Sequence, residues 1–361
     1  MKKAKYSIIK GSGCYIPSQK ILNKDFLQHD FFGADGIKLQ KSNDEIITQF
    51  NHITGIKERR YVSDDLCTSD IAYLAAKEAF DSSGADPELL DYIVVAHNFG
   101  DISKISHRSE MVPSLASRVK HRLKINNPHT VVYDVIFGCA GWLQAVIQCD
   151  YYLRSGEAKN ALVIGAETLS RVADPHDRDS MIYADGAGAV IIETCESEDK
   201  VGILSHTTQS VTNELAGVLK MGKSNNLDYV GDQLFLKMQG RILYEHALKI
   251  VPKAIKKSIE MAGLSINDID MLLIHQANNK MDEAILKRLF DEYEIKNIPA
   301  YIMPMTISWL GNSSVATLPT LYDLLSKNQL ENYNIKKGSN IIFASIGAGL
   351  NINSVVYKVP N

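Results

Sequence analysis

Cys139 is the residue of this sequence best placed to act as a nucleophile. It stands in FGCAGW, directly after an apolar run and at the start of a predicted helix that continues through Leu153. A thiol at a helix N-terminus lies near free backbone N–H groups and the positive end of the helix dipole, which favour the nucleophilic thiolate. The alternative is a small buried cysteine. We expect that structural role for the other four cysteines, Cys14, Cys67, Cys149 and Cys195.

A histidine and an asparagine follow two further apolar segments. His275 ends MLLIH and begins HQANNKM, so it is predicted at the C-terminal edge of a strand, where open α/β sheets form their sites. Asn312 lies in LGNSSVAT, at the start of another predicted helix. A hydrogen-bonded core histidine and a helix N-cap are the structural alternatives. With Cys139 these residues would provide one nucleophile and two hydrogen-bond donors.

Two glycine-rich segments also follow predicted strands. In SIGAGLN the backbone N–H of Ala348 could form an oxyanion hole together with the N–H of Cys139, although an ordinary tight turn is the alternative. YADGAGAV, from Tyr183, lacks the GxGxxG spacing of a nucleotide-binding loop. We expect this second segment to allow close backbone packing.

An internal duplication positions these residues. Residues 75–96 align without gaps on residues 254–275, an offset of 179, and each copy predicts a helix ended by glycine and then an apolar strand. The segment from Val131 corresponds to the segment from Tyr301, each a predicted strand, tight turn and helix, and this pairing sets Cys139 opposite Asn312. The strands ALVIGAE and NIIFASIGAG form a third pair. His275 corresponds to Ala96, so the duplicated unit does not need the histidine to fold.

The repeated order of helix and apolar strand predicts an α/β fold of two similar halves, residues 1–196 and 197–361. Chance similarity between ordinary helix–strand units is the alternative. Cys139 and Asn312 would then lie at related positions near a pseudo-twofold axis, where His275 could meet them. No linker rich in Pro, Gly or Ser separates the halves, so we expect them to pack as one body.

The composition excludes several classes of protein. The 361 residues are 45% hydrophobic and 22% charged, as in globular proteins, and a net charge of -3 gives no general attraction for nucleic acid. No segment approaches the roughly eighteen apolar residues of a membrane-spanning helix, and the start of the chain predicts a strand rather than a signal peptide. Five cysteines without CxxC spacing argue against disulfides and zinc. We expect a cytoplasmic protein with reduced thiols.

At these positions the sequence resembles the β-ketoacyl-acyl carrier protein synthase III family of thiolase-fold condensing enzymes. The motifs GCAG, DPHDR, DGAGAV, HQAN, GNSS and GAG occur in the family's order and span nearly the whole chain. Thiolases have a second cysteine where residues 346–348 stand, and elongating synthases have a second histidine at Asn312. A Cys-His-Asn set is typical of the type III and chalcone-synthase-like branches, and chain length, HQAN and DGAGAV favour type III.

The resemblance implies a thiolase-like duplicated fold with mixed five-stranded sheets in an αβαβα layered arrangement. It implies a decarboxylating Claisen condensation in fatty acid or related lipid or polyketide biosynthesis. Cys139 would carry the acyl group, and His275 and Asn312 would donate hydrogen bonds to a malonyl-type thioester as it loses carbon dioxide. The backbone N–H groups of Cys139 and Ala348 would form the oxyanion hole. It also implies a homodimer, acyl carrier protein as partner, thioester substrates, no metal and no other cofactor.

The resemblance assigns substrate contacts to four residues. These are Arg178 in DPHDR, Gly240, Asn278 and Lys280. Arg178 would contact coenzyme A and Lys280 would dock the acidic carrier protein, while ordinary surface charges are the alternatives for both.

Two segments depart from the family's pattern. The tryptophan and arginine that bracket the adenine of coenzyme A are replaced by Gln49 or Ile46 and by Ile53. Residues 98–113 form a longer segment than the family's counterpart, which contributes to the partner subunit's acyl pocket. We therefore expect unusual acyl selectivity and a donor other than short acyl-coenzyme A.

Two other functions compete with this interpretation. A specialised synthase could condense or cyclise two longer acyl chains to an alkylresorcinol-like product, or the enzyme could transfer its acyl group to another nucleophile. A non-catalytic partner subunit would keep the fold and lose the nucleophile. The presence of Cys139, His275 and Asn312 argues against that last class.

Overall fold

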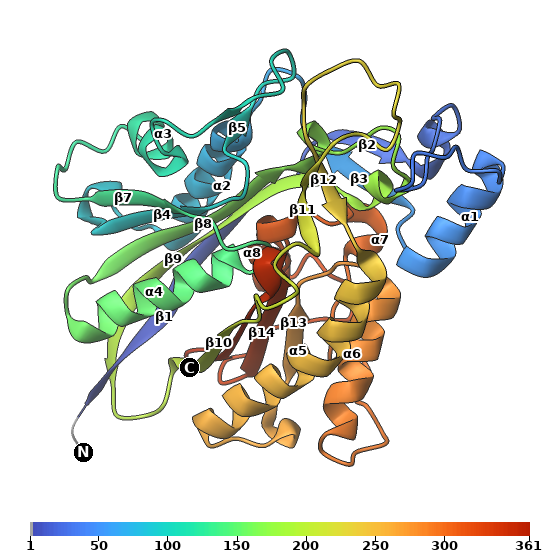
Figure 1. The fold of residues 1–361 in the computed structure, drawn as a ribbon. Helices are drawn as coiled ribbons and strands as arrows, with labels where there is room; N and C mark the ends of the chain where they lie inside the picture. The colour runs from blue at the N-terminus through green and yellow to red at the C-terminus, as the bar shows by residue number, and fades with distance from the viewer. Residues whose placement is uncertain (1–2) are drawn as a thin grey trace.

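The computed structural model describes residues 3–361 as two mixed β-sheets with helices on both faces of each (Figure 1). The first sheet has the strand order β1 (Ala4–Tyr15), β9 (Asp185–Ser197), β8 (Asn160–Thr168), β4 (Tyr92–Ala96) and β7 (Val131–Val135). The second has the order β10 (Gly202–Ser210), β15 (Asn351–Lys358), β14 (Asn340–Gly347) and β13 (Met271–Ile274). In both sheets the antiparallel pairs lie at one side and the parallel pairs at the other.

The helices and sheets alternate in five layers. Helices α4 (Gly141–Ser155) and α8 (Thr317–Ser326) lie between the sheets and pack against apolar residues of both. The outer face of the first sheet is covered by α2 (Thr68–Ser83) and α3 (Leu115–Arg122). The outer face of the second is covered by α5 (Gly240–Ala262) and α6 (Asn279–Asp291). The predicted thiolase-like αβαβα arrangement is therefore confirmed.

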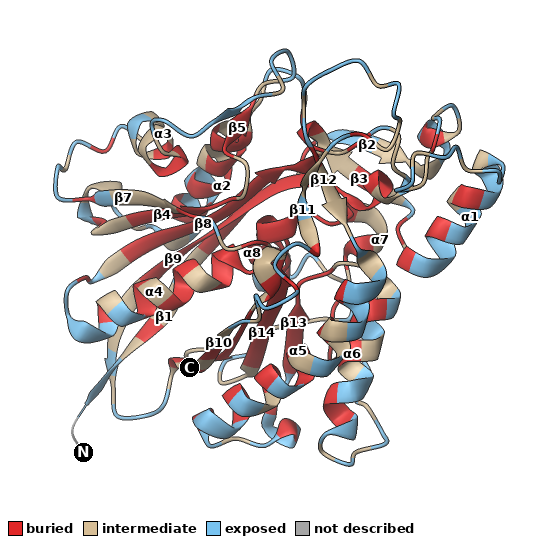
Figure 2. Cartoon of the chain, in the orientation of Figure 1, coloured by how far each residue is buried: buried red, intermediate tan, exposed pale blue. Residues whose placement is uncertain are grey.

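The strands are buried on both faces, as their continuous apolar runs predict. In β8, Ala161 and Val163 pack on the side of α4, while Leu162 and Ile164 pack on the side of α2. This alternation follows from the two-residue period of a strand, and double burial is typical of sheets covered by helices. Figure 2 shows the central parts of both sheets as buried, with exposed residues mainly in the loops and on the outer sides of the surrounding helices.

The corresponding helices α2 and α5 end in the same way. Gly84 follows α2 with a φ of 64°, and Gly263 follows α5 with a φ of 74°. Glycine adopts this left-handed conformation without the steric cost of a Cβ atom. The glycine-ended helices predicted from the duplication are confirmed.

The second sheet has four strands rather than the predicted five. The backbone N–H of Leu272 in β13 donates to the carbonyl of Ile302 (2.8 Å), so this segment lies beside β13 as β7 lies beside β4. A ladder does not form there because Pro304 has no N–H and Tyr301 has a φ of 59°. The segment from Tyr301 is therefore an irregular connection.

Smaller elements surround the ends of the parallel strands. They are β2 (Gln19–Leu22), β3 (Glu58–Tyr61), α1 (Asn43–Thr54), α7 (Ile307–Leu310), β5 (Asp101–Ile102), β6 (Ser109–Glu110), and the pair β11 (Leu219–Gly222) and β12 (Phe235–Met238). The short 3₁₀ helices are η1 (Asn23–Phe26), η2 (Pro87–Leu89), η3 (Leu169–Arg171), η4 (Arg178–Ile182), η5 (Ile266–Asp268), η6 (Ser314–Ala316) and η7 (Ala348–Leu350).

The chain passes from the first sheet to the second between β9 and β10, beside the boundary predicted at residues 196 and 197. The division into two halves as separate units stays a prediction. Across residues 3–361, none of the helices combines the length and the apolar character that crossing a membrane requires.

Candidate active site

Cys139 lies in the turn between β7 and α4. Helix α4 begins at Gly141, with Ala140 as its N-cap. A Cβ atom at Gly138 would overlap with the backbone nitrogen of Ala348, and a Cβ atom at Gly347 would overlap with the backbone nitrogen of Cys139. Only glycine fits at these two positions, so the turn that carries Cys139 and the glycine-rich turn after β14 cross with their backbones in contact.

His275 follows β13 directly and is almost fully buried. Its backbone N–H donates to the carbonyl of Ala344 (2.8 Å), which fixes the residue at the edge of the second sheet. Its Nδ1 atom has no hydrogen-bond partner among the described residues. Burial lowers the pKa of His275 to about 4, against an opposing hydrogen bond with the backbone of Ser314. The imidazole is therefore neutral at pH 7.

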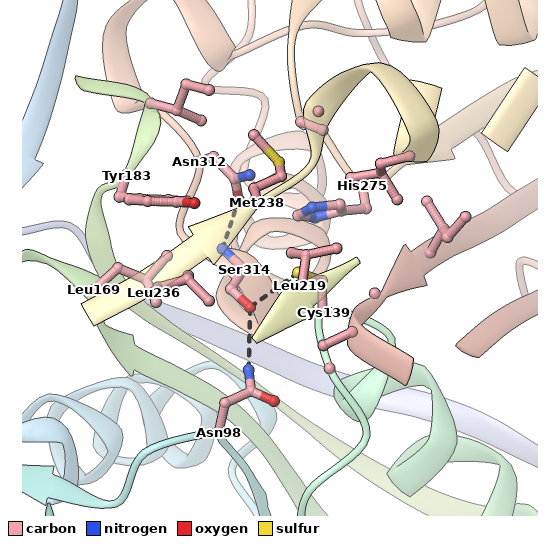
Figure 3. A pocket seen from close by; sticks show the side chains of 18 of the residues that line it. Asn98, Cys139, Leu169, Tyr183, Leu219, Leu236, Met238, His275, Asn312 and Ser314 are labelled. Carbon is pink, nitrogen blue, oxygen red and sulfur yellow. Dashed lines mark hydrogen bonds between the residues drawn. The ribbon is translucent and has the colours of Figure 1, made fainter. Parts of the chain in front are cut away.

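Asn312 is fixed by its backbone and by its side-chain oxygen. Its N–H donates to Ile182 (3.0 Å), and its carbonyl accepts from the N–H of Ala184 (2.9 Å). Its Oδ1 accepts from the N–H of Ser314 (2.8 Å), so its amide NH₂ remains on the side of His275 (Figure 3). This bond stabilises the turn at η6 and not the N-terminus of α8, which begins later, at Thr317.

One cavity of about 270 Å³ joins the predicted residues. Cys139, His275 and Asn312 line it together with Ala348 and Gly138. Most of its remaining wall is apolar and includes Leu169, Ile182, Leu219, Leu236, Met238 and Leu243. The structure therefore brings the three proposed catalytic side chains to a single, mainly apolar cavity beneath the β11–β12 hairpin (Figure 3).

The thiol of Cys139 is protonated at neutral pH. Burial raises its pKa to about 11, the hydrogen bond from Ser314 acts in the opposite direction, and Glu167 contributes to the rise. The thiolate expected from the helix N-terminus stays a prediction, and burial of the sulfur opposes it. All five cysteines are free thiols.

Sequence reasoning missed Ser314 and Asn98. The hydroxyl of Ser314 lies 3.2 Å from the sulfur of Cys139, and the amide nitrogen of Asn98 lies 3.3 Å from that hydroxyl. The signal that could have indicated these two residues was their position in the sequence. Ser314 is two residues after Asn312 in GNSS, and Asn98 is two residues after the repeat partner of His275.

Two family models match the chain on both sides of the cavity. A model described as 3-oxoacyl-[acyl-carrier-protein] synthase III matches residues 133–211, and its C-terminal counterpart matches residues 259–359. The first span contains Cys139, and the second contains His275 and Asn312. The chain belongs to the 3-oxoacyl-[acyl-carrier-protein] synthase III family. It is therefore an enzyme of the acyltransferase class, a condensing enzyme, and the predicted resemblance is confirmed.

Solved structures of synthase III enzymes match along nearly the whole chain. The enzyme from Aquifex aeolicus VF5 is 28% identical, with a TM-score of 0.77 and an alignment that covers 98% of this chain and 99% of that one. The enzyme from Thermus thermophilus is 27% identical, with a TM-score of 0.77 and coverage of 97% and 98%. The priming β-ketosynthase of the R1128 polyketide pathway shares the fold, at 23% identity, TM-score 0.79 and coverage of 100% and 98%.

Three of the four residues predicted to contact substrate, Arg178, Gly240 and Asn278, line the first cavity or one beside it. A second cavity of about 200 Å³ is lined by Gln49, Ile53 and Arg178, and it shares Gly240 and Asn278 with the first. Asn278 is also the N-cap of α6, since its Oδ1 accepts from the N–H of Met281 (2.9 Å).

Lys280 lies outside both cavities. Its ammonium group is exposed and lies 3.1 Å from Nδ1 of His52, at the C-terminal end of α1. Arg178 is also exposed, with its nearest carboxylate, that of Asp179, 3.9 Å away. Among residues 3–361, no group of three or more His, Cys, Asp or Glu side chains is arranged to hold a metal ion.

Proposed function

We propose that this enzyme condenses an acyl thioester with a malonyl-type thioester of acyl carrier protein, through an acyl group carried by Cys139. The main support is that one apolar cavity joins a thiol, a neutral imidazole and an amide whose oxygen is already hydrogen-bonded. The thiol is a nucleophile, and the imidazole and the amide are uncharged hydrogen-bond donors. A reaction that develops negative charge on a thioester oxygen requires such groups.

The first half-reaction transfers the acyl group to Cys139. Because the pKa of this thiol is about 11, its proton must leave as the sulfur attacks the thioester carbonyl. The neutral imidazole of His275, in the same cavity, can accept that proton. The crossing of the two glycine turns supports an oxyanion hole formed by the N–H groups of Cys139 and Ala348. The sulfur–acyl bond of the donor then breaks, and its thiol leaves with the proton.

The second half-reaction forms the carbon–carbon bond. The malonyl carboxylate leaves as carbon dioxide, and the electron pair moves into an enolate whose oxygen accepts hydrogen bonds from Asn312 and His275. Each such donor contributes on the order of 3 kcal/mol. The enolate carbon attacks the acyl carbonyl, and the bond to the sulfur of Cys139 breaks. With a pKa of about 4, His275 stays a neutral donor throughout the physiological pH range.

The lining of the two cavities supports an acyl donor of more than two carbons. Leu219 and Leu236 of the β11–β12 hairpin cover the reacting centre, and Ile53 stands in the place of the family's arginine. These surfaces also favour the second candidate function, a specialised synthase that condenses or cyclises two longer chains. A thiolase-fold acyltransferase would use the first half-reaction alone.

We further propose a cytoplasmic homodimer that works with acyl carrier protein and needs no cofactor besides its thioester substrates. The exposed Lys280, beside the second cavity, suits a contact with an acidic carrier protein. Ile105 and Val112, in the long segment between β4 and α3, are 95% and 90% exposed. Apolar side chains so exposed on one segment support its burial against a partner subunit.

Intact-mass spectrometry with a panel of acyl thioesters tests the proposal. The enzyme is incubated with acyl chains of increasing length on coenzyme A and on carrier protein, and then with malonyl carrier protein. We expect a mass increment on Cys139 and its disappearance, with release of carbon dioxide and a β-ketoacyl product, in the second step. An acyl-enzyme that malonyl carrier protein leaves intact would contradict the condensation and favour simple acyl transfer.

A further inference from the structure

A chain of hydrogen bonds reaches Cys139 from behind the cavity. The hydroxyl of Ser314 lies 3.2 Å from its sulfur. The amide nitrogen of Asn98 lies 3.3 Å from this hydroxyl (Figure 3). The same nitrogen lies 2.8 Å from Oε2 of Glu167. Glu167 is 1% exposed. A buried carboxyl group, an amide and a hydroxyl therefore form one line that ends at the nucleophile.

The chemistry of these groups fixes the direction of each bond. The amide nitrogen of Asn98 can only donate, and Oε2 of Glu167 also accepts from the backbone N–H of Asn98 (3.1 Å). Oε2 is therefore an acceptor whether or not the carboxyl group carries a proton. The oxygen of Ser314 accepts from Asn98, so its single proton is available to the sulfur of Cys139.

The backbone around Ser314 is constrained to make this contact. Ser314 has a φ of 53°, a conformation that is unfavourable for a residue other than glycine. Its N–H donates to Asn312, which holds it there. A Cβ atom at Gly165 in β8 would overlap with the carbonyl oxygen of Val315, the residue after Ser314. Glycine at this position of the strand therefore leaves room for the turn that carries Ser314. The constraint places the hydroxyl against the sulfur.

We propose that Ser314 and Asn98 are positioning residues for the nucleophile: Glu167 anchors Asn98, Asn98 orients the hydroxyl of Ser314, and that hydroxyl donates to Cys139. This inference rests on the proposed role of Cys139 and adds residues to it. The hydroxyl stabilises the negative charge that develops on the sulfur in each half-reaction. Glu167 acts in the opposite direction through its charge, because a negative carboxylate near the sulfur disfavours the thiolate.

The rate of alkylation of Cys139 by iodoacetamide tests the contact from Ser314. The site of modification and its rate are followed by mass spectrometry at pH 8. Ser314→Gly removes the hydroxyl and keeps a residue that adopts positive φ, and Ser314→Ala is the second variant. We expect both to slow alkylation by about threefold to tenfold, since a lost hydrogen bond raises the thiol pKa by about one unit while nucleophilicity partly compensates.

Ser313→Ala is the matched control. Ser313 is a buried hydroxyl next to Ser314, and its oxygen lies 3.4 Å from Oγ1 of Thr317 and makes no contact with the sulfur. Its alkylation rate should equal that of the unchanged enzyme. Unchanged rates in both Ser314 variants would overturn the proposal. Alkylation does not require condensation, so this result is independent of whether the proposed function is correct.

Substitutions of Asn98 and Glu167 should change the alkylation rate of Cys139 in opposite directions, whereas a general loss of packing would not. Asn98→Ala should slow alkylation, because the hydroxyl of Ser314 loses its orienting donor. Glu167→Gln keeps an acceptor for Asn98 and removes the charge, so it should speed alkylation. Burial raises the pKa of Glu167 to about 7, with His97 opposing and Asp185 adding to the shift. The increase should therefore be present at pH 8 and small at pH 6. Slower alkylation in both variants would overturn the proposal.

Discussion

β4 and β13 hold corresponding places in the two sheets, yet the residues that follow them differ in their contacts. After β13, His275 lines the cavity, and the side chain of Gln276 accepts hydrogen bonds from the backbone of the next loop. At the end of β4, Ala96 has no polar side chain, and after it His97 pairs with a carboxylate of β7 and Asn98 lines the cavity. The two halves share the backbone positions at the ends of these strands. The residue type at each position decides which chemical group that half contributes.

The two corresponding turns show the same division. In the first half the helix begins two residues after Cys139, so the nucleophile stands at the start of α4. In the second half a 3₁₀ turn, η6, separates Asn312 from α8. That extra turn carries Ser314 back toward the sulfur. In the proposed mechanism, the first half thus provides the nucleophile, and the second half provides the donors His275 and Asn312.

Removing the nucleophile should have the largest effect. Cys139→Ala replaces a buried thiol by a methyl group in a turn of small residues, so we expect the fold to persist and the acyl-enzyme to be lost completely. Intact-mass spectrometry measures the adduct, and thermal unfolding measures the fold. An adduct that persists at another residue would show that the first half does not supply the nucleophile.

Removing a donor of the second half should separate the two half-reactions. His275→Ala and Asn312→Ala should each slow decarboxylation of the malonyl thioester by about a hundredfold to a thousandfold, because each donor acts on the enolate. Acylation of Cys139 should fall less, and least in the Asn312 variant. The two rates are measured separately, as carbon dioxide release and as adduct formation. Equal losses of rate in decarboxylation and in acylation would contradict the proposed division of roles between the two halves.

Glu167, a buried acid of the first half, should make stability depend on pH. Burial raises the pKa of Glu167 from 4.5 to about 7. Its contribution to the free energy of unfolding is therefore complete below pH 4.5 and is lost as the pH rises through 7, a change of about 3 kcal/mol. Relative to the unchanged enzyme, Glu167→Gln should gain about this amount between pH 4.5 and pH 8 in urea denaturation.

The difference between variant and unchanged enzyme is the informative quantity here. His275, in the second half, has the opposite shift, because burial lowers its pKa to about 4. Its contribution is present above pH 6.5 and is lost as the pH falls toward 4, so it opposes that of Glu167 in the unchanged enzyme. A constant difference between the two proteins across the pH range would refute the assignment of the titrating group to Glu167.

The sequence predicted the parts of the site that depend on strand ends and glycine turns. Cys139, His275 and Asn312 each follow an apolar run, and the duplication related two of them. The strand expected at Tyr301 failed because Pro304 prevents a ladder that the apolar pattern alone favours. The sequence also could not show how strongly burial opposes the thiolate of Cys139, because burial of a sulfur is set by the whole fold.

Ser314 and Asn98 could not be predicted for a different reason. Serine and asparagine are common in turns, where they bond to nearby backbone. Their contact joins residues that are 216 positions apart in the sequence, and no local pattern indicates it. Only the packing of the two halves brings them together.

The last comparison is between the residues that line the two cavities. The reacting centre has the Cys-His-Asn set that the resemblance predicts, whereas the tryptophan and arginine that the resemblance places around adenine are absent from this sequence. Ile46 and Gln49 both line the second cavity, but Ile46 is also buried in an apolar cluster, so we take the exposed Gln49 as the counterpart of the missing tryptophan. Ile53, which the resemblance aligns with the arginine, lines the same cavity. Arg178 remains, exposed beside the same cavity.

The smallest expected effect is the preference between two carriers of the same acyl group. Without a tryptophan and an arginine to stack on adenine, coenzyme A loses about 1 to 3 kcal/mol of binding free energy, which weakens its binding roughly tenfold to hundredfold. A phosphate contact from Arg178 does not replace a stacked sandwich, and a carrier-protein donor lacks adenine. Cys139 should therefore be acylated faster from carrier protein than from coenzyme A for one acyl chain. The double variant Gln49→Trp, Ile53→Arg should narrow this ratio, with Arg178→Ala as the variant expected to widen it. Acetyl-coenzyme A as the fastest donor by a wide margin would mean that the changed residues of the second cavity do not set donor choice.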